Sequence, residues 1–225
     1  MNFRKLIYGG LFVALIGTAE AAEQSPVCRN GLDALMQRDF RGASQHLTQC
    51  LQLDLPDQVR AYILQSRARA YSGLNYPTAS VEDQKASLTF GKLYDVWPLV
   101  TLAGYQRSMK QYDAAMAMLQ QALAYDEDGP GSGPGMGVFY HTGLTLNAMG
   151  KHRDAIEAFD KGIPKQPNFG FAYYSRALAH EALVNRAQAK LDLTKAAELI
   201  PPAEYSRPMI AKFREYGVPT KPILR

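Results

Sequence analysis

Residues 140–169 decide the fold, and they read YHTGLTLNAMGKHRDAIEAFDKGIPKQPNF. Gly143 is a small residue on a first predicted helix, and Ala155 and Phe159 lie one turn apart on a second. The small residue lets the second helix pack closely, and Phe159 fills the space one turn further on. Pro167 is expected to end the second helix, because proline has no amide donor and clashes with the preceding turn. The stretch therefore predicts a helix, a short turn, a second helix and a stop.

The same pattern recurs along the chain. The clearest second copy covers residues 173–202 and reads YYSRALAHEALVNRAQAKLDLTKAAELIPP. The small residue of the second helix recurs at intervals of 36, 36, 40 and 34 residues, as Ala43, Ala79, Ala115, Ala155 and Ala189. Helix pairs at this spacing stack on one another and bury a continuous core between neighbours. The sequence therefore predicts an all-α repeat protein.

The two C-terminal copies resemble the tetratricopeptide repeat family. The matched residues are Gly143, Gly150, Ala155, Phe159, Gly162 and Pro167 in one copy, and Ala177, Ala189, Leu193, Ala196 and Pro201 in the other. The resemblance covers roughly residues 25–203 and implies a right-handed superhelical solenoid of about five helix-turn-helix repeats.

Three earlier copies match less closely. The third keeps Ala115 but has no proline stop, and the first has Cys50 as a small residue. The second has Ala79 as its small residue, which makes its turn one residue short and puts the polar Asp83 where a bulky apolar residue is expected. The predicted repeats are 25–57, 58–92, 96–127, 136–169 and 170–203, followed by a capping helix in 204–217 and a tail at 218–225.

The N-terminus predicts export. Two cationic residues in MNFRK precede the apolar run LIYGGLFVALIGTA, and Ala19-Glu20-Ala21 is a small-x-small cleavage signal. We expect a signal peptide over residues 1–21 and a periplasmic or secreted protein. A spanning helix needs about 20 apolar residues, and no second such run follows, so no membrane span is expected after cleavage. Retention of the signal as an anchor is the alternative.

The two cysteines are predicted to pair. Cys28 lies near the start of the first helix of repeat one, and Cys50 lies near the end of the antiparallel second helix. Both therefore lie at the same end of the hairpin, and an exported chain permits a disulfide between them. The alternative is two small buried thiols, since the family has small residues at such positions. The spacing is not that of a C-x-x-C redox pair.

Signals for catalysis and cofactors are missing. The four histidines, His46, His141, His152 and His180, fall in different repeats and show no metal-binding spacing. The glycine-rich residues 126–137 lack the lysine of a phosphate loop and predict a linker between repeats three and four. Calcium binding by Asp126, Glu127 and Asp128 is the alternative there. We expect no cofactor, no metal and no enzymatic activity.

The net charge excludes one class of partner. It is +4 for the whole chain, and the basic residues are dispersed rather than gathered in a stripe. Nucleic acid is therefore not an expected partner.

The resemblance implies a peptide-binding groove lined by the first helices of successive repeats. By spacing, the groove residues are Tyr62, Gln65, Arg69, Trp97, Arg107, Tyr140, Asn147, Tyr174 and Glu181. Rigid rings with a few polar donors suit a peptide. Packing between helices is the alternative role for each aromatic residue. Cys28 and Leu32 stand where chaperone-binding relatives have the lysine and asparagine of their carboxylate clamp, so binding of a chaperone's acidic C-terminus is not implied.

The predicted function is a non-enzymatic interaction module that scaffolds or chaperones an envelope protein or peptide. The first alternative is a structural subunit of an envelope or secretion assembly, which includes possible self-association. The second is an enzyme that uses the repeats as a scaffold, with Arg69, Arg107, His141 and Glu181 as its ionisable groups. Their spacing does not imply acid-base pairing.

Overall fold

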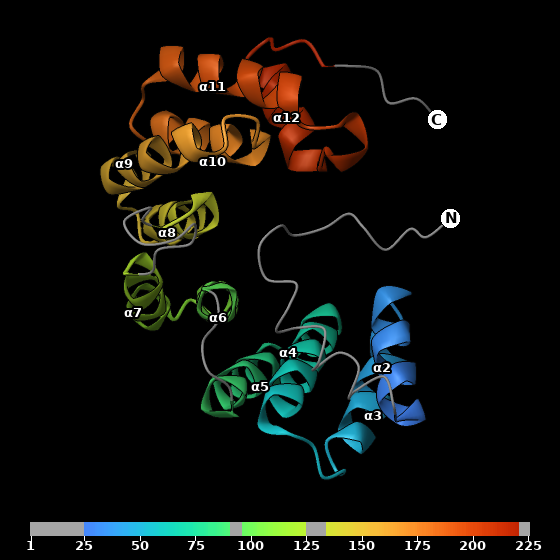
Figure 1. Cartoon of the computed structure of the whole chain (residues 1–225). Helices are drawn as coiled ribbons and strands as arrows, with labels where there is room; N and C mark the ends of the chain where they lie inside the picture. Colours follow the sequence, from blue (N-terminus) through green and yellow to red (C-terminus); the bar gives the residue numbers. More distant parts are fainter. Residues whose placement is uncertain (1–24, 91–95, 125–133, 221–225) are drawn as a thin grey trace. The chain divides into compact units, whose positions relative to one another are not determined.

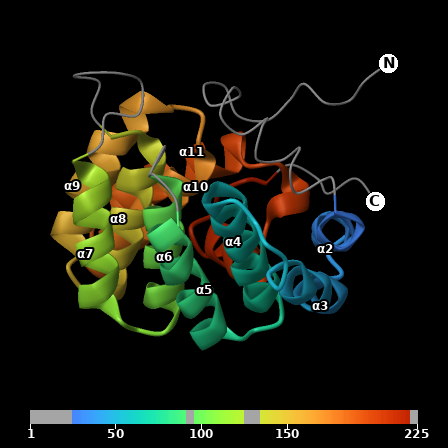
Figure 2. The same ribbon diagram turned by 60° about the horizontal axis from the view of Figure 1, so that its bottom comes forward.

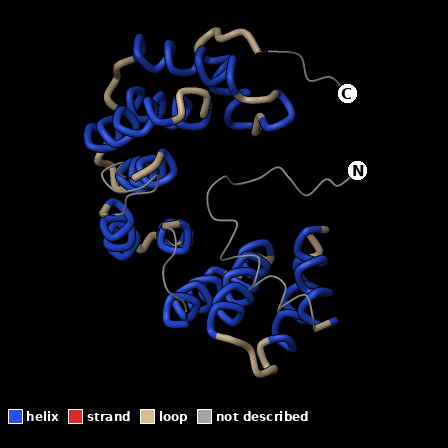
Figure 3. Tube along the Cα trace, in the orientation of Figure 1, coloured by secondary structure: helices blue, strands red, loops and turns tan. Residues whose placement is uncertain are grey.

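The computed structural model describes residues 25–90, 96–124 and 134–220. Every regular element in these ranges is a helix, as Figure 3 shows, so the predicted all-α class is confirmed. The chain divides into two compact units, Met1–Tyr94 and Asp95–Arg225, and each is described by itself. None of the helices in the described ranges combines the length and the apolar character that crossing a membrane requires.

The first unit contains two helix pairs. They are α2 (Pro26–Met36) with α3 (Phe40–Cys50), and α4 (Asp57–Gly73) with α5 (Pro77–Phe90). Helix α4 contacts α5 along its length and also packs on α2 and α3 (Figures 1 and 2). The pairs therefore stack as consecutive repeats.

The second unit contains three further pairs and a final helix. The pairs are α6 (Trp97–Ser108) with α7 (Tyr112–Leu123), α8 (Met136–Ala148) with α9 (His152–Gly162), and α10 (Gly170–Ala182) with α11 (Arg186–Leu199); α12 (Arg207–Glu215) follows. The first helices are neighbours, because α8 contacts both α6 and α10 (Figure 1).

All five helix pairs use the same turn. Two residues before each second helix, one residue has a left-handed backbone, with φ between 59° and 76°: Arg38, Asn75, Lys110, Gly150 and Val184. The next amide donates to the carbonyl five residues earlier, for example from Asn185 to His180 at 2.8 Å. This bond ends a helix in the Schellman manner. The turn therefore fixes where each second helix begins.

The turn corrects the predicted register of the second repeat. The residue five positions after the left-handed one is fully buried in every pair, and in α5 this residue is Ser80 rather than Ala79. The turn is therefore not short, and the buried Gln84 occupies the bulky position that the sequence analysis gave to Asp83. Ala79 and Ser80 are both small, so composition alone does not separate the two registers.

The proline stops are only partly as predicted. Helix α11 ends at Leu199, just before Pro201, as expected. Helix α9 ends at Gly162 and continues as a 3-10 turn over Ile163–Lys165, so Pro167 lies beyond the helix rather than at its end.

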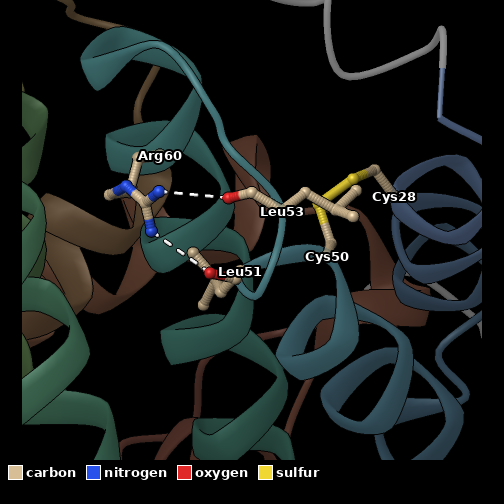
Figure 4. The surroundings of a disulfide bond; sticks show 5 residues. All are labelled: Cys28, Cys50, Leu51, Leu53 and Arg60. Carbon is tan, nitrogen blue, oxygen red and sulfur yellow. Dashed lines mark hydrogen bonds between the residues drawn. A yellow bond between two sulfur atoms is a disulfide. The ribbon is translucent and has the colours of Figure 1, made fainter.

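A disulfide joins the two helices of the first pair. Cys28 of α2 and Cys50 of α3 are bonded, with S–S 1.98 Å, and both are fully buried (Figure 4). Beside them, Arg60 of α4 donates to the carbonyls of Leu51 and Leu53, each at 3.2 Å. These bonds satisfy carbonyls at the end of α3 and tie the first pair to the second.

Candidate binding surface

The three first helices of the second unit carry six of the nine predicted groove residues. We call this surface the α6–α8–α10 face and define it by Trp97, Arg107, Tyr140, Asn147, Tyr174 and Glu181. Trp97 is 45% exposed, whereas the other five are partly buried. The remaining three predicted residues, Tyr62, Gln65 and Arg69, belong to α4 of the first unit, where Tyr62 packs against the core and Arg69 is exposed.

Aromatic side chains of the face are held in place by packing. A Cβ atom on Gly137 would lie 2.6 Å from the Trp97 ring, so the indole rests directly on the backbone of α8. The Tyr140 ring stands edge-on to Phe169, with 5.0 Å between centroids. Tyr174 is edge-on to Phe213 of α12 at 6.2 Å. These rings are therefore pre-positioned rather than free.

Asn147 bridges two repeats. Its side-chain amide donates to the backbone carbonyl of Ser175 on α10 at 3.2 Å, and its oxygen is 3.0 Å from His152 Nδ1. The nitrogen and the oxygen of the side-chain amide therefore both have partners within the second unit. Asn147 thus fixes α8 against α10, a role that was not predicted for it.

Arg107, near the end of α6, lies against α8. Its Nη1 atom is 3.5 Å from His141 Nδ1 and 3.4 Å from Thr145 Oγ1. The Thr145 hydroxyl donates to the His141 carbonyl at 2.9 Å, so its oxygen is available to accept from Arg107. The sequence analysis named His141 only as a possible catalytic group and did not name Thr145.

His141 is held neutral in this position. Burial, and secondly the charge of Arg107, lower the pKa of His141 from 6.5 to about 4. A neutral ring that accepts at Nδ1 carries its proton on Nε2. Burial also lowers the pKa of Arg107, but a guanidinium stays charged at neutral pH. A cation therefore sits beside two neutral acceptors.

Two other arginines on first helices have carboxylate partners. Arg67 donates from Nε and Nη2 to Asp83, both at 2.7 Å, and Arg176 donates from the same two atoms to Asp192 at 2.8 and 2.6 Å. The hydrogen bonds to these aspartates raise the pKa of each arginine. Nε and Nη2 of Arg107, in contrast, have no partner among residues 25–90, 96–124 and 134–220.

Acidic side chains are scarce on the face. Helices α6 and α8 contain no Asp or Glu, and α10 contains only Glu181. The Glu181 carboxylate accepts from Lys212 Nζ at 2.8 Å and from the Tyr216 hydroxyl at 3.0 Å, both contributed by the C-terminal cap. Glu181 is thus engaged by the cap instead of standing free as a groove residue.

Two further predictions concern residues near the chain's gaps and ends. The signal peptide at 1–21 and the calcium alternative at 126–128 lie outside the described residues. In the part of the chain that the structure describes, no group of three or more His, Cys, Asp or Glu could hold a metal ion.

Comparison with known proteins identifies the repeat. Residues 99–128, which include α7 and most of α6, match the tetratricopeptide repeat family. Among curated protein sequences, none matches the chain. The match covers one helix pair of the second unit.

Solved structures share the fold. MamA is 27% identical, with a TM-score of 0.59, and the match covers 75% of this chain and 92% of MamA. Pseudomonas aeruginosa pilF is 19% identical, with a TM-score of 0.69, over 89% of this chain and 85% of pilF. YrrB, described as a TPR protein with an unusual peptide-binding site, is 16% identical, with a TM-score of 0.59, over 88% and 97%. The chain thus has the helical repeat fold of these proteins.

Proposed function

We propose that this chain, with its tetratricopeptide repeat at residues 99–128, is a protein-interaction module that holds a peptide segment of a partner on the α6–α8–α10 face. The observation that carries the proposal is the exposure of Trp97, which is 45% although its ring rests on the backbone of α8. Rigid, half-exposed aromatic rings are the side chains that most often anchor protein partners. The peptide-binding site named for YrrB adds a precedent on the same fold.

The proposal includes no chemistry by the chain itself. A catalytic histidine needs a group that orients it as a base, usually a carboxylate. His141 instead has the Arg107 guanidinium beside its Nδ1, and this cation disfavours proton uptake. The face therefore supports binding better than acid-base catalysis.

The proposed place of action is the periplasm or the exterior, and the proposed partner is an envelope protein. Support comes from the N-terminal sequence and from the Cys28–Cys50 disulfide, since structural disulfides persist in oxidising compartments. Fractionation of cells that express the full chain tests this part, because a cytoplasmic protein that retains residues 1–21 would contradict it.

A peptide-display selection tests the binding function. A library of random peptides is selected against the protein expressed from the full 225-residue sequence, and the affinity of the enriched peptides is measured by calorimetry. We expect Trp97→Ala to weaken binding by about tenfold or more. Leu191→Ala is the matched control, because Leu191 is 63% exposed but lies on α11, a second helix. The proposal fails if no peptide is enriched, or if both variants bind like the wild type.

A further inference from the structure

Among the residues that the structure describes, one edge of the Arg107 guanidinium has hydrogen-bond partners and the other has none. Its Nη1 atom is held by His141 and Thr145 of α8, at 3.5 and 3.4 Å. Nε and Nη2, which together carry three N–H donors, have no acceptor in the described ranges. These two atoms form the edge that binds a carboxylate through two parallel hydrogen bonds.

Two other arginines of the chain show which group binds at this edge. In Arg67 and Arg176 the Nε and Nη2 atoms each donate to one oxygen of an aspartate, at 2.6 to 2.8 Å. Nη1 of Arg67 is held by a threonine hydroxyl, Thr48 Oγ1, at 3.0 Å. Arg107 thus has the threonine contact of Arg67 but has no aspartate partner within the described ranges.

Among residues 25–90, 96–124 and 134–220, no acidic side chain pairs with Arg107. Neither α6 nor α8 contains an acidic residue, and Glu181 of α10 is bonded to Lys212 and Tyr216. A partly buried guanidinium without an anion is unfavourable, so an incoming carboxylate would gain a charge-assisted pair.

We propose that the Nε–Nη2 edge of Arg107 binds the side-chain carboxylate of an Asp or Glu in the partner peptide. This inference rests on the proposed function and names the chemistry of the partner. We assign a side chain within the peptide rather than a terminus, because the aromatic residues proposed to hold the peptide lie on α6 itself and also on α8 and α10. His141 and Thr145 act as positioning residues, since they hold Nη1 and thereby orient the open edge.

The surface of α6 beside His141 has room for a larger side chain at Gly104. A Cβ atom added to Gly104, one turn before Arg107, would meet only His141 ring atoms, at 3.9 Å. A larger side chain at this position can therefore be used to fill the space beside the site without removing the arginine.

The test uses the enriched peptides from the display selection. Each Asp or Glu is replaced singly by Asn or Gln, and separate peptides carry an amidated C-terminus. Affinities are measured for the wild type, Arg107→Met, Gly104→Leu and Lys190→Met. The last variant is the charge control, because Lys190 is exposed on α11. Thermal unfolding followed by circular dichroism checks that each variant is folded.

We expect one acidic position at which amide replacement weakens wild-type binding by about tenfold or more. Arg107→Met should bind acid and amide peptides within about twofold of each other, and Lys190→Met should behave like the wild type. Gly104→Leu keeps the arginine but fills the space beside it. This variant should therefore also bind the acid and amide peptides with similar affinity.

Three results would overturn the inference. The first is that amide replacement costs nothing in the wild type, and the second is that its cost persists in Arg107→Met. The third is a loss caused only by amidation of the C-terminus, which would assign the site to a terminal carboxylate. Failure of the proposed function looks different, because the selection against the wild type would then enrich no peptide.

Discussion

The Phe159 ring of α9 lies so close to the backbone of Gly143 in α8 that a Cβ atom there would be 2.6 Å from two ring atoms. Gly31 and Leu47 have the same relation in the first unit, where the added atom would be 2.8 Å from the leucine side chain. The absence of a side chain therefore sets the distance between the helices in both pairs.

Gly143→Ala should destabilise the protein by about 1 to 3 kcal/mol, because Phe159 is fully buried and cannot move aside. Gly104→Ala is the matched control in α6, where the added methyl has room. Since alanine favours a helix more than glycine does, this control should gain up to about 1 kcal/mol. Urea unfolding measures both, and equal shifts in the two variants would contradict the close approach.

Val184→Gly should stabilise the protein by about 1 kcal/mol. Val184 is 81% exposed and has φ 59°, a backbone that β-branched residues rarely adopt. Gly150→Ala is the reverse change at the equivalent position, with φ 76° and nothing within 4 Å of the added atom. It should cost about 1 kcal/mol through the backbone alone. Denaturant midpoints that shift in the same direction would count against this account.

Replacement of Cys28 and Cys50 by serine should cost roughly 3 kcal/mol in the chain-entropy relation, because the bond closes a loop with a sequence separation of 22. Hydrogen exchange read by mass spectrometry should show faster exchange in peptides from α2 and α3, with α10 and α11 as the internal reference. The disulfide itself is tested by the mass of the purified protein, which should rise by about 2 Da on reduction. Unchanged exchange in α2 and α3 would contradict the stabilising role.

His141 should make stability depend on pH. The pKa of His141 in the folded protein is about 4, below the ordinary 6.5, because of burial and then Arg107. The unfolded chain therefore takes up the proton first, so this contribution to stability is fully present above pH 6.5 and is lost as pH falls toward 4. Melting temperatures between pH 7 and 4 should fall more for the wild type than for His141→Gln. Parallel curves would show that the histidine is not held neutral.

Much of the fold could be predicted from the sequence, because each helix pair is defined by local features. Gly143 and Phe159 are separated by one short turn, so their spacing in sequence reports their contact in space. The second repeat was the exception. Its sequence predicts Ala79 as the small residue, but Ser80 is the buried one, because the turn that fixes the register depends on a backbone angle at Asn75.

Asp83 takes part in a charge pair that comparison with other repeats does not reveal. It was a misfit when compared with bulky residues of other repeats, yet it pairs with Arg67 sixteen positions earlier. Arg176 and Asp192 have the same separation and the same contact. This recurrence of arginine and aspartate is a signal that a search for paired charges within a hairpin would have found.

The environment of Arg107 could be predicted only in part. The absence of acidic residues from α6 and α8 is visible in the sequence. The contacts with His141 and Thr145 are not, because they join positions 34 and 38 residues apart on different repeats. Such contacts depend on how one hairpin is rotated on the next, which repeat spacing does not encode.

The bonds from Lys212 and Tyr216 to Glu181 limit the addition of further helix pairs at the C-terminal end of the repeats. A further hairpin stacked after α11 would need the surface that α12 now covers with the buried Met209 and Phe213. Duplication of a repeat at this end would break the ion pair and expose the core. An additional helix pair is therefore tolerated better between existing pairs than after α11.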